Sequence, residues 1–362
     1  MFIFLFILVA GLVLIYANVS PVAPGKKGKL IALGILIAIF LGMFFRHTLV
    51  GCIMVAFTSV WLCQALLFYI PWDLFRGVRR IVVRRALPSK TLMLASRILL
   101  TATITLTLGL FAYGVPHNSN YKLLETTVDS GKSSFTAVFF SDVHVDPLFK
   151  RAKLEQMIAD VDSIAPDYLL FGGDLADVSM EQLDERGYDS LFRKLTSKAK
   201  VAAVAINGNH EGMQEGSGMA PGEWMRKVGF VVLDDSSACI GQACFTGRTD
   251  FQVARRRGVE RVPLATLAPS DSERPWILMD HQPKGIKPEY TGRLPDFALS
   301  GHTHNGQFFP GTVVIKLVWR LAYGEGILDG VRWLVSSGVD CWGPPVRVGS
   351  DADMWVIRFK EQ

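Results

Sequence analysis

The stretch Asp296-Phe-Ala-Leu-Ser-Gly-His302-Thr-His304-Asn305 contains the clearest signal for the fold and for a functional site. Its short apolar run ends at Ser300-Gly301, and two histidines follow at positions i and i+2. A strand that ends abruptly and passes two imidazoles to a loop is a common way to hold a metal ion. The sequence therefore predicts a metal site at the carboxyl end of a strand.

Four other segments repeat this pattern of a short apolar run followed by residues that can bind a metal. They are Phe135–Ser141 before Asp142 and His144, Asp167–Phe171 before Asp174, Val201–Ile206 before Asn209 and His210, and Trp276–Met279 before Asp280 and His281. A single Asp-x-His is weak evidence, since it is more often a surface pair, a lone Gly-Asp means almost nothing, and a lone Gly-Asn-His is moderate evidence. Five strand ends that meet at one edge of a fold would bring all these side chains to one site.

Apolar and basic residues are concentrated in residues 1–115. Half of the 362 residues are hydrophobic. Residues 1–115 hold eleven Lys and Arg and one acid, a net charge of +10, whereas the remainder holds 27 basic and 32 acidic residues, a net charge of −5. Basic loops between apolar runs are typical of a protein beside an anionic membrane face. We therefore expect membrane lipids, and no nucleic acid, among its partners.

Four apolar runs predict about four transmembrane helices in residues 1–115. They cover Met1–Ala17, Leu30–Phe45, Thr48–Ile70 and Ile98–Val115, and only Arg46-His47 separates the second from the third. A spanning helix needs about 20 apolar residues, with a range of about 17–25. Three of the runs are near the lower limit, so the alternative is that one of them is buried or re-entrant. Because Met1–Ala17 lacks the basic start of a signal peptide, we expect it to be retained.

The charges of the loops predict the orientation of the chain. Lys26, Lys27 and Lys29 follow the first run, and six basic residues from Arg76 to Lys90 follow the third. With four spans both basic loops lie on one side, which the positive-inside rule makes cytoplasmic. We expect a multi-pass protein of a bacterial-type inner or plasma membrane, with an extracytoplasmic domain after Val115. Arg76–Leu87 is either a basic amphipathic helix on the inner leaflet or a solvated run of charge.

Two cysteines bear on whether the domain after Val115 lies outside the cytoplasm. If Gly241-Gln242 is a two-residue hairpin turn, Cys239 and Cys244 face each other across it, with Cα atoms about 4.5–5.5 Å apart. That separation suits a disulfide, which implies an oxidising compartment. The alternative is a pair of buried thiols. Cys341 would remain a free thiol.

The second half of the chain predicts a linker and one domain. Residues 116–133 are polar and read as the linker, and residues 134–362 form the domain. Helical spacing predicts helices over Lys150–Ile164, Met180–Lys200 and Glu223–Val228. Apolar runs predict strands at Val313–Val318, Trp333–Ser336 and Met354–Phe359. Strands that alternate with helices argue for a layered α/β fold, with a second sheet after Phe245.

The order of the motifs resembles the calcineurin-like metallophosphoesterases over about residues 134–358. Within that superfamily the chain is similar to the membrane-anchored branch, which includes transmembrane metallophosphoesterases and enzymes like the UDP-diacylglucosamine pyrophosphohydrolases. The tail Val335–Arg347, which contains Trp342-Gly-Pro-Pro345, resembles the closing motif of that branch. The resemblance implies an N-terminal transmembrane region followed by two facing mixed β-sheets flanked by helices.

The resemblance also implies a site for two divalent metal ions. By position, Asp142, His144 and His304 would bind one ion, Asn209, His281 and His302 the other, and Asp174 would bridge them as a catalytic ligand. His210 would stabilise the transition state or protonate the leaving group. Mixed carboxylate and imidazole ligands suit Mn, Fe or Zn, and Mn is favoured. A hydroxide shared by the two metals would attack phosphorus in a phosphodiester or pyrophosphate bond.

The phospho-substrate is less well defined by sequence. The branch suggests a lipid-linked substrate such as UDP-diacylglucosamine, a lipid A precursor. That step is cytoplasmic, however, so an envelope phosphodiester is the rival. Arg347, Arg248 and Asp250 are candidate substrate contacts, although each, like Asp177, can instead be structural.

Two departures from the branch pattern lie beside the predicted site. Asn305 replaces the usual glycine, and Asp340-Cys341 replace small residues. Both affect the expected substrate specificity rather than metal binding. The alternative function is a non-catalytic, metal-stabilised membrane scaffold, and the sequence leaves the oligomeric state open.

Overall fold

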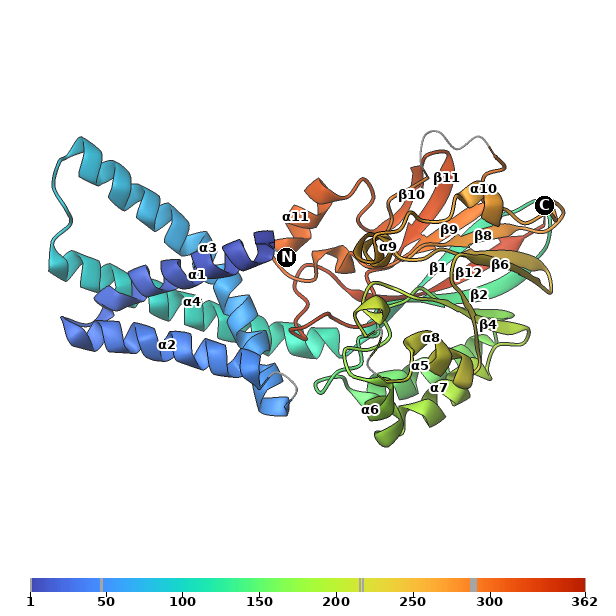
Figure 1. Cartoon of the computed structure of the whole chain (residues 1–362), viewed down its shortest axis with the longest axis horizontal. Coiled ribbons are helices and arrows are strands. Elements are labelled where there is room, and N and C mark those ends of the chain that lie inside the picture. The colour runs from blue at the N-terminus through green and yellow to red at the C-terminus, as the bar shows by residue number, and fades with distance from the viewer. Residues whose placement is uncertain (1, 46–47, 215, 217, 287–291, 362) are drawn as a thin grey trace. The chain divides into compact units, whose positions relative to one another are not determined.

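The chain divides into two compact units, Met1–Val115 and Pro116–Gln362. The structure, a computed structural model, describes residues 2–45, 48–214, 216, 218–286 and 292–361. Met1, at the start of the first predicted span, and Arg46-His47, which separate two predicted spans, lie outside these residues. Figure 1 shows the order of the elements along the chain.

Long apolar helices make up the first unit. They are α1 (Phe2–Val19), α2 (Lys26–Phe44), α3 (Leu49–Val82) and α4 (Ser89–Asn118), with the short 3₁₀ helix η1 (Ser20–Val22) after α1. The last three residues of α4 belong to the second unit. Buried side chains such as Ala65 and Tyr69 pack the helices together, and the indole of Trp61 donates a hydrogen bond to Thr103 Oγ1.

Three of these helices, α2, α3 and α4, are long and apolar enough to cross a membrane. The apolar stretch Val9–Val22, which runs from α1 into η1, is shorter than this, so the described residues contain three candidate spans where about four were predicted. Arg76–Leu87, interpreted from sequence as either a basic amphipathic helix or a solvated run of charge, does not form a helix of its own. Arg76–Val82 instead continues α3, which ends where Val83 leaves the helix.

Two six-stranded mixed sheets form the second unit. The first has the order β1 (Tyr121–Asp129), β12 (Ala352–Lys360), β2 (Phe135–Phe140), β3 (Tyr168–Phe171), β4 (Ala202–Ile206) and β5 (Phe230–Leu233). The second has the order β10 (Gly324–Leu328), β11 (Val331–Val335), β9 (Phe297–Ser300), β8 (Trp276–Met279), β7 (Ala243–Gly247) and β6 (Ser236–Ile240). In the first sheet β2 to β5 run parallel, and in the second β7, β8, β9 and β11 do.

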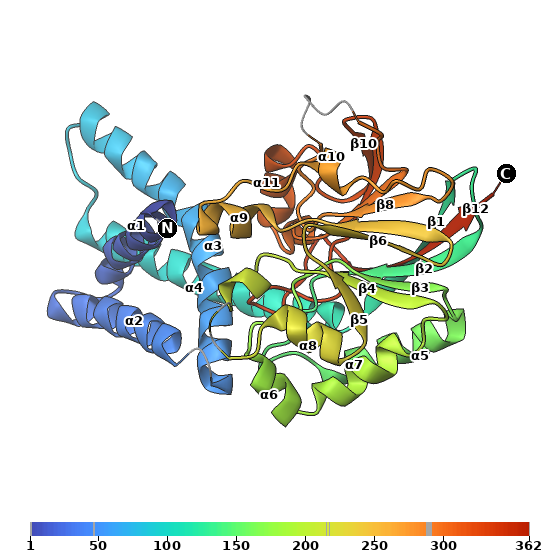
Figure 2. The same ribbon diagram turned by 45° about the vertical axis from the view of Figure 1, so that its right-hand side comes forward.

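The helices of this unit are short and cover the sheets from outside. They are α5 (Arg151–Ile164), α6 (Met180–Glu185), α7 (Tyr188–Thr196), α8 (Pro221–Lys227), α9 (Phe251–Arg257), α10 (Leu264–Leu267) and α11 (Gly311–Val318), with the 3₁₀ turns η2 (Glu211–Met213) and η3 (His304–Gly306). Figure 2 shows α5, α7 and α8 along one face of the first sheet. Their apolar sides bury residues such as Leu154 and Trp224 against it.

A second core lies between the two sheets. Residues of the first sheet such as Phe139 and Leu170 pack there against Phe245, Ile277 and Leu299 of the second. Buried strands with apolar residues on both faces are typical of sheets covered on both sides. The predicted architecture of two facing mixed sheets flanked by helices is therefore confirmed.

Three predictions for this unit are wrong. The predicted linker 116–133 contains β1, a strand whose polar pattern reflects its place at the edge of the first sheet, where β12 is its one partner among the described strands. The predicted strand Val313–Val318 lies in helix α11, because β-branched residues favour a strand only where a partner strand is available. The predicted helix Met180–Lys200 breaks at Gly187, whose φ of +71° is left-handed, and gives α6 and α7.

The hairpin at Cys239 forms as predicted. Cys239 and Cys244 pair across the β6–β7 turn, their Cα atoms are 3.9 Å apart, and their sulfur atoms form a disulfide. The observed Cα distance is shorter than the predicted range. Cys341 is a buried free thiol.

Candidate metal centre

The predicted ligands stand at the carboxyl ends of five parallel strands. Asp142 follows β2, Asp174 follows β3, Asn209 follows β4, His281 follows β8, and His302 with His304 follows β9. Three of these strands belong to the first sheet and two to the second. Because the strands of each set run parallel, their ends lie at one edge of each sheet, and the facing edges bring the loops together.

The backbone of these loops is unusual. Asp142, His144, Asp174, His302 and His304 all have positive φ values, between +45° and +70°. Residues other than glycine rarely adopt this conformation, and such strain gathers at functional sites. The surrounding fold therefore holds these five side chains in directions that an ordinary strand-to-loop turn would not give.

Two glycines make room for the carboxylates of the site. A Cβ atom at Gly301 would lie 2.2 Å from Asp142 Oδ2, and one at Gly208 would lie 2.2 Å from Asp174 Oδ1. Backbone groups then fix both carboxylates. The amide of His302 donates to Asp142 at 3.1 Å, and the amide of His210 donates to Asp174 Oδ1 at 2.9 Å.

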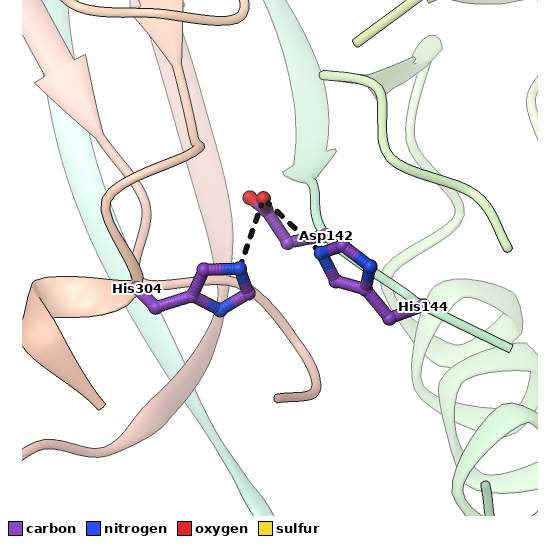
Figure 3. Close-up of side chains that lie close together, drawn as sticks. All are labelled: Asp142, His144 and His304. Atoms are coloured by element: carbon purple, nitrogen blue, oxygen red, sulfur yellow. Dashed lines mark ion pairs between the residues drawn. The ribbon is translucent and has the colours of Figure 1, made fainter. Parts of the chain in front are cut away.

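The ligand side chains form two groups with short separations. In the first, one ligand atom each of Asp142, His144 and His304 lies within 4.8 Å of the others. Figure 3 shows both imidazoles turned toward the Asp142 carboxylate, with His304 Nε2 at 3.4 Å and His144 Nε2 at 3.8 Å from Oδ1. In the second, Asp174, His281 and His302 meet the same limit.

Asp174, a member of the second group, also lies close to a histidine of the first. Its Oδ2 lies 3.1 Å from His281 Nε2 and 3.6 Å from His144 Nε2. Its carboxylate is therefore the one that links a histidine of the first group to a histidine of the second, as expected for a ligand shared by two ions.

In three histidines, Nδ1 lies close to an oxygen acceptor of the protein and Nε2 faces the carboxylates of the site. Nδ1 of His281 lies 2.8 Å from Gly172 O, and Nδ1 of His304 lies 3.2 Å from Asp340 O. Nδ1 of His144 lies 3.3 Å from an oxygen of Asp177. A neutral imidazole that donates from Nδ1 carries its lone pair on Nε2, the arrangement found in metal-binding histidines.

The lone pairs of this cluster lack partners. Four of the predicted ligands have a buried atom with no hydrogen-bond partner among the described residues: His144 Nε2, Asn209 Oδ1, His281 Nε2 and His302 Nδ1. Buried polar groups are normally paired, so orphaned acceptors that face carboxylates need a cation between them. The residues present therefore fit two divalent ions, with Asn209 offering a neutral oxygen.

Burial sets the protonation of two of these histidines. It lowers the pKa of His302 to about 4 and that of His304 to about 3, so both are neutral ligands at neutral pH. Burial also lowers the pKa of His281, but the carboxylate of Asp174 outweighs it and raises that pKa above its usual value. An uncompensated pair of carboxylates thus attracts positive charge, whether a proton or a metal ion.

Comparison with known proteins agrees with this geometry. Residues 135–306 match the family model described as calcineurin-like phosphoesterase. An uncharacterized metallophosphoesterase of Aquifex aeolicus is 30% identical over 227 residues, which cover 61% of this chain and 83% of that protein. The chain belongs to the calcineurin-like metallophosphoesterases.

Other metallophosphoesterases extend beyond the shared region. An uncharacterized metallophosphoesterase of Helicobacter pylori is 27% identical over 243 residues, covering 66% of this chain and 64% of that protein. A zebrafish (Danio rerio) protein described as a transmembrane protein with metallophosphoesterase domain is 27% identical over 240 residues, covering 62% of this chain and 53% of that protein. The chain thus spans less than two thirds of the length of these two relatives. The family includes proteins with membrane segments, as this metallophosphoesterase has.

His210 lies beside the cluster and is oriented by a residue that the sequence left undecided. His210 Nδ1 is 2.6 Å from Asp177 Oδ1, and the His210 ring contacts that of His144 in a T-shaped arrangement. Asp177, His144 and His210 form a third group that meets the 4.8 Å limit. The position of Asp177 three residues after Asp174 is the signal that could have identified its role.

Glu211 is a second residue of the site that sequence reasoning missed. Its buried carboxylate accepts hydrogen bonds from the amides of Asp174 at 3.0 Å, Leu175 at 2.5 Å and Gly208 at 2.6 Å. Glu211 therefore ties the loop after β3, which carries Asp174, to the loop after β4, which carries Asn209. Only its place next to His210 marked it in the sequence.

Arg347 does not reach the site, contrary to its predicted contact with substrate. Its side chain is fully buried and donates to the carbonyls of His304, Ser337, Gly338, Asp340 and Asp351. A guanidinium whose donors are spent on backbone carbonyls has none left for a phosphate. Arg347 instead fixes residues 337–340 against the loop that carries His304.

Arg248 and Asp250 also have other roles than substrate contact. Asp250 is buried and caps α9 by accepting from the amides of Gln252 and Val253. Arg248 lies 3.7 Å from the buried Asp280 and donates to Val262 O at 3.4 Å. These partners give both side chains structural roles, and contact of either one with a substrate stays a prediction.

The two departures from the branch pattern each have a structural reason. Asn305 has a φ of +48°, a left-handed conformation that asparagine tolerates better than most residues other than glycine. Asp340 is buried and forms an ion pair of 2.8 Å with the buried Lys153 of α5. Neither residue disturbs the ligand geometry.

Proposed function

We propose that this chain is a membrane-anchored, dinuclear-metal phosphohydrolase that cleaves a phosphodiester or pyrophosphate bond. One observation carries the proposal: the orphaned ring nitrogens of His144, His281 and His302 gather around Asp142 and Asp174. Asp142, His144 and His304 would hold one ion, Asn209, His281 and His302 the other, and Asp174 both. The mixed oxygen and nitrogen ligands favour Mn, with Fe and Zn as alternatives. When bound, such a pair of ions supplies charge neutralisation at the phosphoryl group and a nucleophilic hydroxide at neutral pH.

Asp177 and His210 contribute to the reaction directly: Asp177 orients the His210 ring, and His210 supplies a proton. Asp177 accepts from Nδ1 of His210 at 2.6 Å, so the other ring nitrogen points away from Asp177. Burial lowers the pKa of His210, but the hydrogen bond to Asp177 outweighs it and raises that pKa above its usual value. A protonated Nε2 can then donate to the leaving oxygen as the bond to phosphorus breaks, which is general acid catalysis.

Hydrolysis of an aryl phosphodiester by the purified full chain with Mn tests the proposal. Asp174→Ala and His210→Ala should abolish hydrolysis. His117→Ala is the matched control because His117 lies outside the ligand groups and pairs with Asp351 on the surface. If the wild-type chain and both site variants show the same background rate while still binding Mn, the chain is instead a metal-stabilised membrane scaffold.

The proposed orientation places the second unit outside the cytoplasm. With α2, α3 and α4 as spans, Lys26–Lys29 and the basic loop before α4 lie on one side, and the chain after α4 lies on the other. The Cys239–Cys244 disulfide supports an oxidising compartment. A reporter fused to the carboxyl terminus tests this: alkaline phosphatase should be active there, and fluorescence of a reporter that folds only in the cytoplasm would refute it.

The proposed substrate is a phosphoester or pyrophosphate carried by a lipid. The membrane anchor supports this class, with UDP-diacylglucosamine as one candidate and an envelope phosphodiester as the other. Hydrolysis of lipid-linked pyrophosphates and of simple phosphodiesters by the detergent-purified chain distinguishes them.

A further inference from the structure

Helix α11 exposes an apolar face that nothing in the described part of the second unit covers. None of its eight residues is buried, and Leu317 and Val318 are 84% and 67% exposed. Val313 with Leu317, and Val314 with Val318, are i, i+4 pairs, so these four side chains form one stripe along the helix. Figures 1 and 2 show α11 beside the sheets rather than between them. An exposed contiguous apolar patch marks an interaction site.

This stripe is continuous with the metal cluster. The loop after β9 carries His304, and Gly306 of that loop packs closely on Gly311, the first residue of α11. At the other end of the helix, the indole of Trp319 contacts the His302 ring with a centroid distance of 5.5 Å. Whatever binds the stripe therefore lies within a few residues of two candidate metal ligands.

Other apolar side chains extend the stripe around the site. Phe309, just before α11, is about half exposed. Trp342 is 55% exposed, and its ring lies 5.8 Å from that of His210. Tryptophan favours the interface between a bilayer and water, where its ring and its N–H find suitable surroundings. Aromatic residues thus flank the cluster on the His302 side and on the His210 side.

The charge of α11 and the attachment of its domain point to one occupant, a phospholipid bilayer. The helix carries no acid, and its only charge is Lys316, which is exposed beside the stripe and suits anionic headgroups. The apolar part of α4 extends to Val115, and β1 begins at Tyr121, so the chain enters this domain within a few residues of the membrane. A helix of eight residues is only about 12 Å long and cannot span, but it can lie in the interface.

We propose that α11 is an interfacial helix that docks this domain on the phospholipid bilayer and holds the metal cluster at the level of the headgroups. Val313, Val314, Leu317 and Val318 enter the acyl boundary, and Lys316 contacts headgroup phosphates. The docking itself does not depend on catalysis. Its consequence, that the bond to be cleaved belongs to a lipid headgroup, rests on the proposed phosphohydrolase function.

Depth-dependent quenching tests the docking without any measurement of activity. The full chain, with Cys52 and Cys63 changed to serine, is placed in nanodiscs of phosphatidylcholine and phosphatidylglycerol. A fluorophore is attached at Leu317→Cys. Val201→Cys is the negative control, because Val201 is exposed at the start of β4, the end opposite the cluster. Leu108→Cys is the positive control, because Leu108 is an exposed residue of the α4 span.

Lipids that carry a quencher in the acyl chain should reduce the fluorescence at position 317 nearly as much as at position 108, and leave position 201 unchanged. If the quencher lipids reduce the fluorescence at position 317 no more than at position 201, the proposal is overturned. Energy transfer between probes at position 317 of two copies, without quenching by lipid, also overturns it and identifies the stripe as a contact between copies.

A second measurement separates docking from catalysis. Leu317→Asp should lower the rate on a phosphodiester lipid in vesicles by more than about tenfold, the cost of withdrawing one leucine from an apolar phase. The rate on a soluble aryl phosphodiester should not change, which also shows that the variant folds. Val201→Asp should change neither rate. Equal rates of Leu317→Asp and wild type on the vesicle substrate would refute the docking, whereas absence of hydrolysis of both substrates by wild type would refute only the proposed function.

Discussion

Asp340→Ala should destabilise the second unit strongly, because it removes one partner of a buried ion pair. Asp340 Oδ2 lies 2.8 Å from Lys153 Nζ, and the two side chains are 9% and 1% exposed. Loss of the carboxylate leaves a buried ammonium whose one remaining partner among the described residues is Val339 O at 2.8 Å. Leaving such a charge unpaired costs about 3–5 kcal/mol. In a domain of this size that corresponds to a fall in melting temperature of about 6–20 °C.

The reverse change, Lys153→Met, should cost less. Asp340 Oδ1 would still accept from Asn118 Nδ2 and from the amide of Cys341, both at 2.7 Å. A carboxylate with two donors is better compensated than an ammonium with a single carbonyl. The double variant Lys153→Met/Asp340→Ala should therefore be more stable than Asp340→Ala alone, since it removes the unpaired charge.

Thermal unfolding of the detergent-solubilised full chain measures these differences. Tryptophan fluorescence reports the second unit, because Trp224, Trp276 and Trp333 are fully buried there. Glu155→Gln is the matched control: Glu155 pairs with Arg151 at 3.2 Å on the surface of α5, where such a pair is worth less than about 1 kcal/mol. Our reasoning fails if Asp340→Ala shifts the melting temperature no more than this control does, or if the effects of the two single variants simply add in the double variant.

Three further predictions concern the metal cluster. Asp177→Asn should lower the rate of aryl phosphodiester hydrolysis by about 10²–10⁴-fold even at saturating Mn, because His210 loses the carboxylate that orients and charges it; an unchanged rate would contradict its role. Chelation of bound metal should lower the melting temperature, and Mn at about a hundred times its dissociation constant should restore about 2.7 kcal/mol, measured by thermal unfolding; no response to Mn would argue against a site. Gly301→Ala should weaken Mn binding in calorimetry, because the added Cβ lies 2.2 Å from Asp142 Oδ2, and wild-type affinity would refute that close approach.

The ligand cluster could be predicted from the sequence because its signals are local. Each ligand follows a short apolar run, and the run itself predicts where the strand ends. Parallel strands then bring these ends together without any information on side-chain packing. Glycines such as Gly208 and Gly301, which leave room for Asp174 and Asp142, also stand beside their ligands in the chain.

The roles of Arg347 and of Val313–Val318 could not be predicted in this way. Arg347 looks like a phosphate ligand in sequence, and only the folded path of residues 337–340 surrounds it with carbonyl groups. Val313–Val318 has the composition of a strand, but β-strand propensity acts through a neighbouring strand. In the described residues this segment pairs with none, and it begins after Pro310 as a helix.

The two unusual residues at positions 340 and 341 are explained together by the end of α4. Asn118, the last residue of that helix, donates to Asp340 Oδ1, and its own Oδ1 accepts from the thiol of Cys341 at 3.2 Å and from Arg347 Nε at 3.3 Å. The backbone of Asp340 in turn donates to Asp142 O at 3.1 Å and lies 3.2 Å from Nδ1 of His304. A small residue at position 340 could not bond to Asn118 or compensate Lys153. Asp340 therefore connects Asn118 to two candidate metal ligands, so a substitution at Asn118 should alter metal affinity.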